Sequence, residues 1–135
     1  MFQNICRKKE IVLHSFNKDI GDYGESLAES YLVSIGFIIL ASKFRCKIGE
    51  IDLICRDGNY IVFVEVKSRY SSRFGTPADS VTYKKQTKIF KAAQFYIMKY
   101  MLHNNNFRFD VVEVLLNSSD NKFDISLIKN AFQLK

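Results

Sequence analysis

Four ionisable side chains lie in two apolar segments that are otherwise typical of buried strands. The segment "GEIDLICR" contains Glu50 and Asp52, and the segment "YIVFVEVKSR" contains Glu65 and Lys67. Charge in a protein interior is costly unless it is paired or holds a metal ion. Carboxylates with open coordination positions suit Mg²⁺ or Mn²⁺, and a nearby lysine can hold a water or neutralise a phosphate. These residue types therefore favour metal-dependent hydrolysis of a phosphodiester.

The two segments are predicted to form a hairpin, because the turn signal "DGN" lies between them. A two-residue loop at 58–59 places Asp52 opposite Glu65 and Glu50 opposite Lys67, with all four side chains on one face. Opposed side chains lie about 5 Å apart at Cβ, so two opposed carboxylates repel unless one is protonated or a cation lies between them. A three-residue loop would break this shared face.

A structural interpretation of the same residues stays open. Glu50 and Lys67 would form a cross-strand ion pair, and Asp52 and Glu65 would be solvated on an open sheet face. The apolar surroundings favour the metal-site interpretation over the structural one, since a strand buried on both faces has little reason to carry adjacent acids. One face is predicted to carry Ile51, Leu53, Val62, Val64 and Val66, and the other Ile54, Ile61 and Phe63.

The remaining pattern predicts the elements that position these residues. Helical periodicity indicates a helix over 19–36, capped by Asp19 and ended by Gly36, with Glu25 bordering its apolar stripe. A second helix is predicted over 80–102. Strands are predicted over 37–45, 50–56, 60–67 and 107–116, and 122–128 is either a fifth strand or a tail segment. The order αβββαβ, with or without a final strand, indicates an α/β fold with helices packed on a mixed sheet.

Composition limits the organisation and the partners. A chain of 135 residues is expected to be one domain over 19–135, preceded by a weakly specified lead-in over 1–18. The net charge of +6 fits nucleic acid, or an acidic membrane surface, although many small basic proteins bind neither. Three cysteines without C-x-x-C spacing suggest neither disulfides nor a zinc knuckle. We see no signal peptide or membrane span, and expect a cytoplasmic protein without a membrane partner.

Several ordered motifs resemble the YraN-type family of small bacterial proteins. They are "GDYGESLAESYLVSIGFIIL", "GEIDLI", "VFVEVKSR", "FGTPADSVTYKKQTKI" and "RFDVV", which together span about residues 20–115. The resemblance implies a restriction-endonuclease-like fold, similar to archaeal Holliday-junction resolvases and the PD-(D/E)XK nucleases. It also implies cleavage of DNA, including branched or single-stranded recombination and repair intermediates. Because resolvase-like enzymes are usually two-fold symmetric, an interaction protein that works as a homodimer is a further alternative.

The resemblance also implies roles for individual residues. Asp52, Glu65 and the Val66 carbonyl would bind Mg²⁺ or Mn²⁺, and Lys67 would orient the attacking water. Glu25 would complete a second metal site or form a hydrogen bond with Lys67. Glu50 belongs to the family's GEID motif.

One position departs from the family pattern. The family commonly has asparagine two residues before Arg45, and this chain has Lys43.

The main alternative to a nuclease is a module that keeps this fold and binds nucleic acid without cleaving it.

Basic residues outside the strands are candidates for contact with nucleic acid. Three lysines are spaced as a stripe on the second helix, and they are Lys84, Lys88 and Lys91. The loop 68–77 adds Arg69 and Arg73 beside aromatic residues that could stack on bases. An ordinary solvated helix face and an ordinary surface loop are the alternatives.

Overall fold

The structure is a computed structural model that describes residues 16–70, 81–117 and 122–133, with two helices and five strands in these ranges. The elements are α2 (Phe16–Ser34), β1 (Ile38–Arg45), β2 (Glu50–Asp57), β3 (Tyr60–Tyr70), α3 (Tyr83–Lys99), β4 (Asn106–Leu116) and β5 (Phe123–Ile128). One mixed sheet has the order β1-β2-β3-β4-β5, in which only β3 and β4 pair in parallel. The predicted α/β class is confirmed, and it is compatible with a restriction-endonuclease-like fold.

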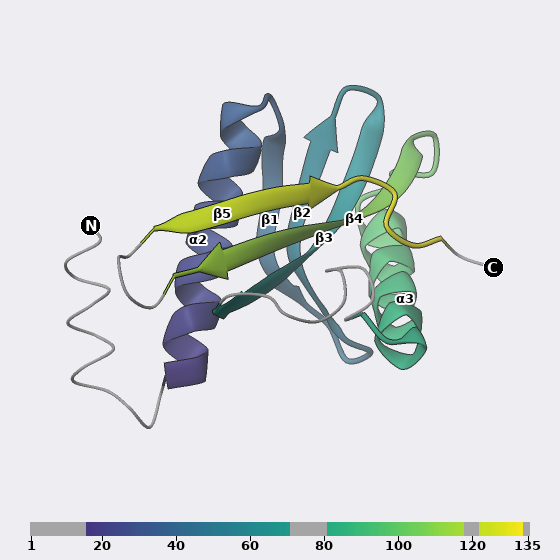
Figure 1. Cartoon of the computed structure of the whole chain (residues 1–135). Helices are drawn as coiled ribbons and strands as arrows, with labels where there is room; N and C mark the ends of the chain where they lie inside the picture. Colours follow the sequence, from purple (N-terminus) through teal and green to yellow (C-terminus); the bar gives the residue numbers. More distant parts are fainter. Residues whose placement is uncertain (1–15, 71–80, 118–121, 134–135) are drawn as a thin grey trace.

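The two helices cover opposite faces of the sheet, and Figure 1 shows the strands between them. Leu27, Ala28 and Leu32 of α2 pack on one face, where they meet alternate residues of β3 and β4. Ile89 and Phe90 of α3 pack on the other face, within a cluster that is rich in aromatic side chains. Because the central strands are buried on both sides, they read as continuous apolar runs. In the described part of the chain, neither helix is long and apolar enough to cross a membrane.

The first helix ends where the sequence predicts, but it begins earlier. Gly36 has φ +101°, and the amides of Gly36 and Phe37 donate to the carbonyls of Val33 and Leu32. These two bonds form a Schellman motif, which requires a left-handed residue and so favours glycine. The helix begins at Phe16, so Asp19 lies inside the helix and the predicted cap at Asp19 is wrong.

The predicted register of the β2–β3 hairpin is confirmed. Asp57 pairs with Tyr60 across the two-residue turn, and Leu53 pairs with Val64. Gly58 has φ +60°, as such a turn requires. The same offset carries Asp52 toward Glu65, one position beyond the last paired residues.

The hairpin changes at Asp52, and two predictions fail there. Pairing with β3 ends at Leu53, and Ile51 packs in the α3 cluster while Leu53 packs in the α2 cluster. The predicted common face of Ile51 and Leu53 is therefore wrong, because the alternation of β2 breaks between them. Glu50 does not face Lys67, because β2 no longer pairs with β3 at this position, and the Glu50 carboxylate lies 3.3 Å from Arg45 of β1.

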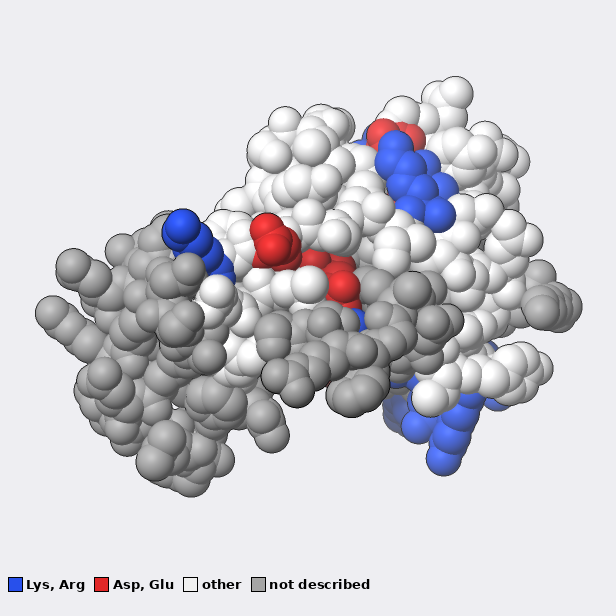
Figure 2. Space-filling view, viewed as in Figure 1, with Lys and Arg blue, Asp and Glu red and all other residues white. Residues whose placement is uncertain are grey.

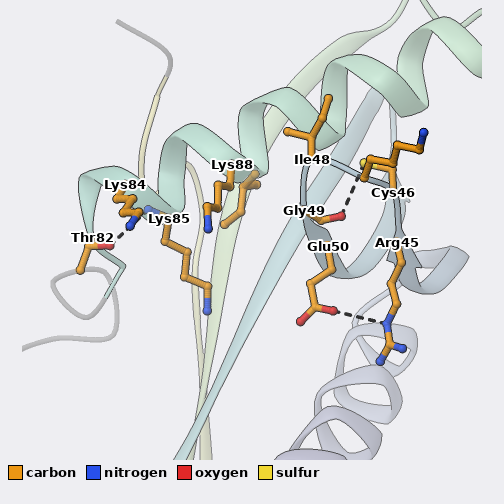
Figure 3. Close-up of a pocket in the computed structure, with 11 residues that line it drawn as sticks. Arg45, Cys46, Ile48, Gly49, Glu50, Thr82, Lys84, Lys85 and Lys88 are labelled. Carbon is orange, nitrogen blue, oxygen red and sulfur yellow. Dashed lines mark hydrogen bonds and ion pairs between the residues drawn. The ribbon is translucent and has the colours of Figure 1, made fainter.

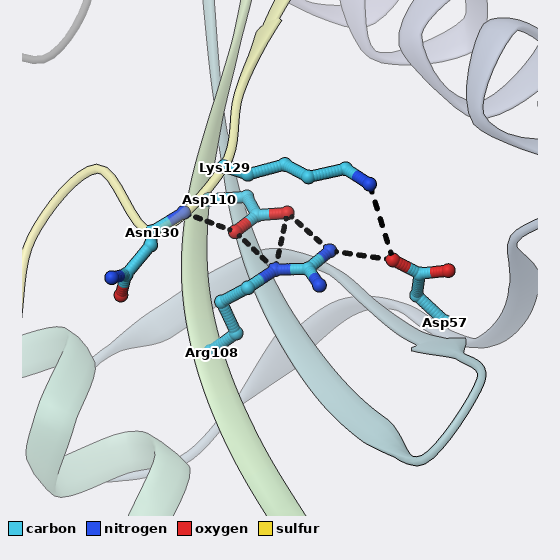
Figure 4. A network of polar contacts seen from close by, with 5 residues as sticks. All are labelled: Asp57, Arg108, Asp110, Lys129 and Asn130. Carbon is cyan, nitrogen blue, oxygen red and sulfur yellow. Dashed lines mark hydrogen bonds and ion pairs between the residues drawn. The ribbon is translucent and has the colours of Figure 1, made fainter.

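A buried polar network closes the other end of the sheet (Figure 4). Arg108 of β4 donates to both carboxylate oxygens of the fully buried Asp110, and to Asp57 Oδ2 at 2.9 Å. The amide of Asn130 also donates to Asp110 Oδ1, at 2.9 Å. The Lys129 ammonium reaches Asp57 from the exposed side. The network thereby joins the β2–β3 turn, β4 and the segment that follows β5.

Lys43 adopts a backbone conformation that favours asparagine, the residue that the family resemblance predicts at this position. Its φ is +53°, a left-handed value that asparagine tolerates better than lysine. We expect Lys43→Asn to raise the melting temperature by about 2–5 °C. The half-exposed ion pair with Asp22, at 3.1 Å, adds little stability that the substitution could lose.

Thermal unfolding followed by circular dichroism measures this effect. Lys47→Asn is the matched control, because Lys47 is exposed and its φ is not positive. A fall in melting temperature for Lys43→Asn would contradict the explanation from backbone strain.

Candidate active site

A cavity of about 500 Å³ opens between α2, the ends of β2 and β3, and the start of α3. It contains the four side chains to which the family resemblance gives roles in metal binding or in orienting water, which are Glu25, Asp52, Glu65 and Lys67. The other lining residues are Ile20, Gly21, Val66, Ser68, Arg69, Tyr70 and Lys85. We call this cavity the acidic site.

Close contact between α2 and β3 places Glu25 at the acidic site. Gly24 is buried, and a Cβ there would lie 1.6 Å from Ser68 Oγ. Glycine therefore lets the helix touch the strand at the point where the next side chain, Glu25, reaches the cavity. Burial raises the pKa of Glu25, and Lys43 lowers it. The charges of Asp22, Glu50 and Glu65 raise this pKa further.

Asp52 is held by the neighbouring strand at the point where pairing stops. Its Oδ2 accepts a hydrogen bond from the Val66 amide at 2.7 Å. This bond satisfies the amide where continued pairing would have supplied a main-chain carbonyl of β2. Burial and the charge of Glu65 together raise the pKa of Asp52 to about 7. Two carboxylates therefore share a partly desolvated site, and their repulsion favours any cation that enters it.

Two lysines lie against Glu65. The ammonium of Lys85, from the first turn of α3, lies 2.6 Å from Glu65 Oε1, and that of Lys67 lies 4.0 Å from the same atom. Burial lowers the pKa of Lys67, and the charge of Lys85 lowers it further. For Lys85 the hydrogen bond and charge of Glu65 outweigh burial, so its pKa is raised. Lys67 is thus the more easily deprotonated of the two.

The sequence interpretation missed Lys85. It lies four residues before Ile89, on the core-facing side of α3, whereas its neighbour Lys84 is exposed. A lysine one turn before a buried residue is a signal that could have identified it. Its partner could not be read from the sequence, because α3 and β3 meet only in the folded protein.

The chemistry of the acidic site fits a hard divalent cation with few protein ligands. Asp52 and Glu65 offer carboxylate oxygens, the donors that Mg²⁺ and Mn²⁺ prefer, and their repulsion would be relieved by such an ion. Within residues 16–70, 81–117 and 122–133, no three His, Cys, Asp or Glu side chains form a metal-binding group. Glu25 therefore lines the cavity without joining a three-acid cluster, and the remaining ligands would be the Val66 carbonyl and water.

The other predicted residues are divided among different surroundings. Arg69 lines the acidic site, but its guanidinium forms an ion pair with the buried Glu113 of β4. Arg73 lies outside the described residues. Lys84 and Lys88 line a second cavity together with Arg45 and Glu50, and Lys91 lines a different hollow beside Phe90.

These features define an α/β protein in which carboxylates and lysines line a cavity, the acidic site, at one end of a mixed sheet. Residues 24–114 match the family described as Uncharacterised protein family UPF0102. A UPF0102 protein of Clostridium botulinum (strain Kyoto / Type A2) is 53% identical over 123 residues, which cover 90% of this chain and 100% of the relative. A UPF0102 protein of Clostridium kluyveri is 52% identical over 122 residues, with the same coverage. The chain belongs to the UPF0102 family, which confirms the expected YraN-type membership.

Proposed function

We propose that this protein is a metal-dependent nuclease that hydrolyses phosphodiester bonds in DNA. The observation that carries the proposal is the acidic site, where Asp52 and Glu65 repel each other beside two lysines. Carboxylates kept close together at a cost to stability are typical of sites that act on charged substrates. The net charge of +6 supports a polyanionic substrate.

The roles of the residues follow from their surroundings. Asp52, Glu65 and the Val66 carbonyl would hold Mg²⁺ or Mn²⁺, which supplies charge neutralisation at the phosphate and a more acidic water. Lys67 would orient the attacking water, and burial and the charge of Lys85 lower its pKa, which makes the ammonium easier to deprotonate. Lys85 neutralises charge on the phosphoryl oxygens. Water forms the new bond to phosphorus, and the bond to the leaving sugar oxygen breaks.

One contact favours a second candidate function, a nucleic-acid-binding module without catalysis. The Lys85 ammonium lies on Glu65 at 2.6 Å, so a protein side chain already supplies the positive charge that the acids need. In that case the protein would bind DNA in a salt-dependent manner, and changes at Asp52 or Lys67 would not alter the binding.

Cleavage of a panel of labelled DNAs tests the proposal. Duplex, single strand, flap and four-way junction are incubated with Mg²⁺, with Mn²⁺ or with EDTA. We expect metal-dependent products from at least one DNA, and a loss of about a hundredfold or more in Lys67→Ala. The preferred DNA would indicate whether branched or single-stranded intermediates are the substrate.

Lys99→Ala is the matched control, because Lys99 is an exposed lysine in the last turn of α3 and lines neither cavity. It should cleave like the wild type. Equal cleavage by Lys67→Ala and wild type would point to a contaminating nuclease. Absence of products from all four DNAs, with DNA binding intact in every variant, would favour the binding module.

A further inference from the structure

A second cavity of about 610 Å³ lies beside the acidic site, between the β1–β2 turn and the start of α3. Five of its lining residues are cationic, and they are Arg45, Lys47, Lys84, Lys85 and Lys88. The others are Cys46, Ile48, Gly49, Glu50, Thr82 and Ile89. We call this cavity the basic pocket. In Figure 3, Lys85 and Lys88 extend from the helix toward the space that Arg45 and Glu50 face.

Two of the five cations in the basic pocket are paired, Arg45 with Glu50 and Lys85 with Glu65 of the acidic site, and the other three are not paired with any residue that the structure describes. The one carboxylate that lines the pocket, Glu50, lies 3.3 Å from Arg45. In the described part of the chain, no carboxylate lies within ion-pair distance of Lys47, Lys84 or Lys88. Like charges gathered without partners repel each other, so an anion that enters the pocket relieves the repulsion. Figure 2 shows Lys and Arg side chains projecting at the end of the molecule where α3 begins.

The walls of the basic pocket are formed by main-chain packing. The amide and the thiol of Cys46 both donate to the Gly49 carbonyl, at 3.0 and 3.5 Å, and close the turn between β1 and β2. A Cβ on Gly49 would lie 3.4 Å from both Cβ and the carbonyl oxygen of Lys88, which is an ordinary contact distance, so the turn lies directly against α3. The cationic side chains are thus carried by two elements in contact.

The start of α3 adds to the attraction for an anion. Thr82 caps the helix by accepting from the Lys85 amide at 3.2 Å, and the first turn contains no acidic residue. The positive end of the helix dipole therefore lies at the same place as Lys84 and Lys85. Lys85 lines both cavities, so an anion in the basic pocket would lie next to the acidic site.

We propose that the basic pocket binds a phosphate group of the nucleic acid other than the one that is cleaved. This inference rests on the proposed function for the identity of the substrate. The phosphate would be either an internal phosphodiester or a terminal monophosphate, since the same cations bind both. Binding there fixes where the strand crosses the acidic site, because Lys85 belongs to both cavities.

DNA binding in EDTA tests the proposal without cleavage. Fluorescence anisotropy is measured with labelled single-stranded and duplex oligonucleotides, each with a 5′-phosphate or a 5′-hydroxyl. We expect Lys84→Gln/Lys88→Gln to bind at least tenfold more weakly, with a salt dependence lower by roughly one to two released counterions. The charge-matched control is Lys99→Gln/Lys122→Gln, which removes two exposed lysines that line neither cavity, and should lose about twofold or less.

The 5′ ends distinguish the two sources of phosphate. A terminal site predicts a preference of the wild type for the 5′-phosphate that disappears in Lys84→Gln/Lys88→Gln. An internal site predicts equal binding of both ends and an equal loss for both. Equal losses in the two double variants, or no loss in either, would overturn the proposal, provided that thermal unfolding shows both to be folded.

The outcome is separable from that of the nuclease proposal. If the wild type cuts no DNA but Lys84→Gln/Lys88→Gln binds DNA more weakly than the wild type, the phosphate-binding proposal stands and the nuclease proposal fails. If the wild type cuts DNA with a metal ion, and wild type and Lys84→Gln/Lys88→Gln bind DNA equally well, the nuclease proposal stands and the phosphate-binding proposal fails.

Discussion

Replacing Asp52 by asparagine should stabilise the metal-free protein and abolish cleavage at the same time. Asparagine is nearly isosteric and keeps an oxygen that can accept the bond from the Val66 amide. It removes the charge that repels Glu65 and that burial disfavours. We expect the melting temperature at pH 8 to rise by about 4–8 °C. Cleavage should fall by about a thousandfold or more, because a ligand of the metal is lost.

The stabilisation should depend on pH in a defined direction. The pKa of Asp52 is raised from 3.8 to about 7 on folding, so the folded protein holds a proton that the unfolded chain has lost between these values. The contribution of Asp52 to stability is therefore most favourable below about pH 4, decreases as the pH rises, and is most unfavourable above about pH 7. The melting temperatures of wild type and Asp52→Asn should converge as the pH is lowered toward 4.

Divalent ions should reverse the order of stability. Mn²⁺ binds the folded wild type and relieves the repulsion, so its melting temperature should rise by several degrees at about a hundredfold excess over the dissociation constant. Asp52→Asn should respond much less. Glu50→Gln is the control, since it removes an exposed carboxylate from the same strand outside the acidic site. A melting temperature for Asp52→Asn below that of the wild type at pH 8 would contradict the repulsion, whatever happens to cleavage.

Replacing Arg108 by methionine should lower the free energy of unfolding by about 3–5 kcal/mol. The substitution leaves Asp110 fully buried with only the Asn130 amide as a hydrogen-bond partner among the described residues. It also removes the guanidinium from the rings of Phe37 and Tyr60, whose centroids lie 5.7 and 5.2 Å away. Urea unfolding followed by circular dichroism measures the loss. Cleavage should be unaffected at temperatures where the variant is folded, because the network does not line either cavity.

Two further variants make this prediction specific. Arg108→Met/Asp110→Leu removes the unpaired carboxylate and should recover much of the lost stability, because a buried ion pair contributes little over apolar residues of similar size. Lys129→Met removes the exposed member of the network and should cost less than about 1 kcal/mol. A loss in Lys129→Met equal to that in Arg108→Met would show that burial of Asp110 is not the cause.

Local patterns determined the elements and the register of the central hairpin. Gly36 ends the first helix, and the turn at 58–59 connects the hairpin strands. Both depend on local backbone conformation, which neighbouring residues determine. Because side chains alternate along a strand, the turn also fixes that Leu53 pairs with Val64 and that Asp52 is carried toward Glu65. The sequence was therefore sufficient to predict that Asp52 and Glu65 converge at the acidic site.

Only the tertiary structure decided the partners of those residues. Pairing of β2 with β3 stops at Leu53, so Glu50 turns to Arg45 and the predicted contact with Lys67 is lost. Lys85 reaches Glu65 because α3 packs across the sheet, a contact between positions 20 residues apart that no local period encodes. Periodicity indicates which side of an element is buried. It does not indicate where a strand leaves its neighbour or which charged group from another element arrives there, because both depend on how the layers pack.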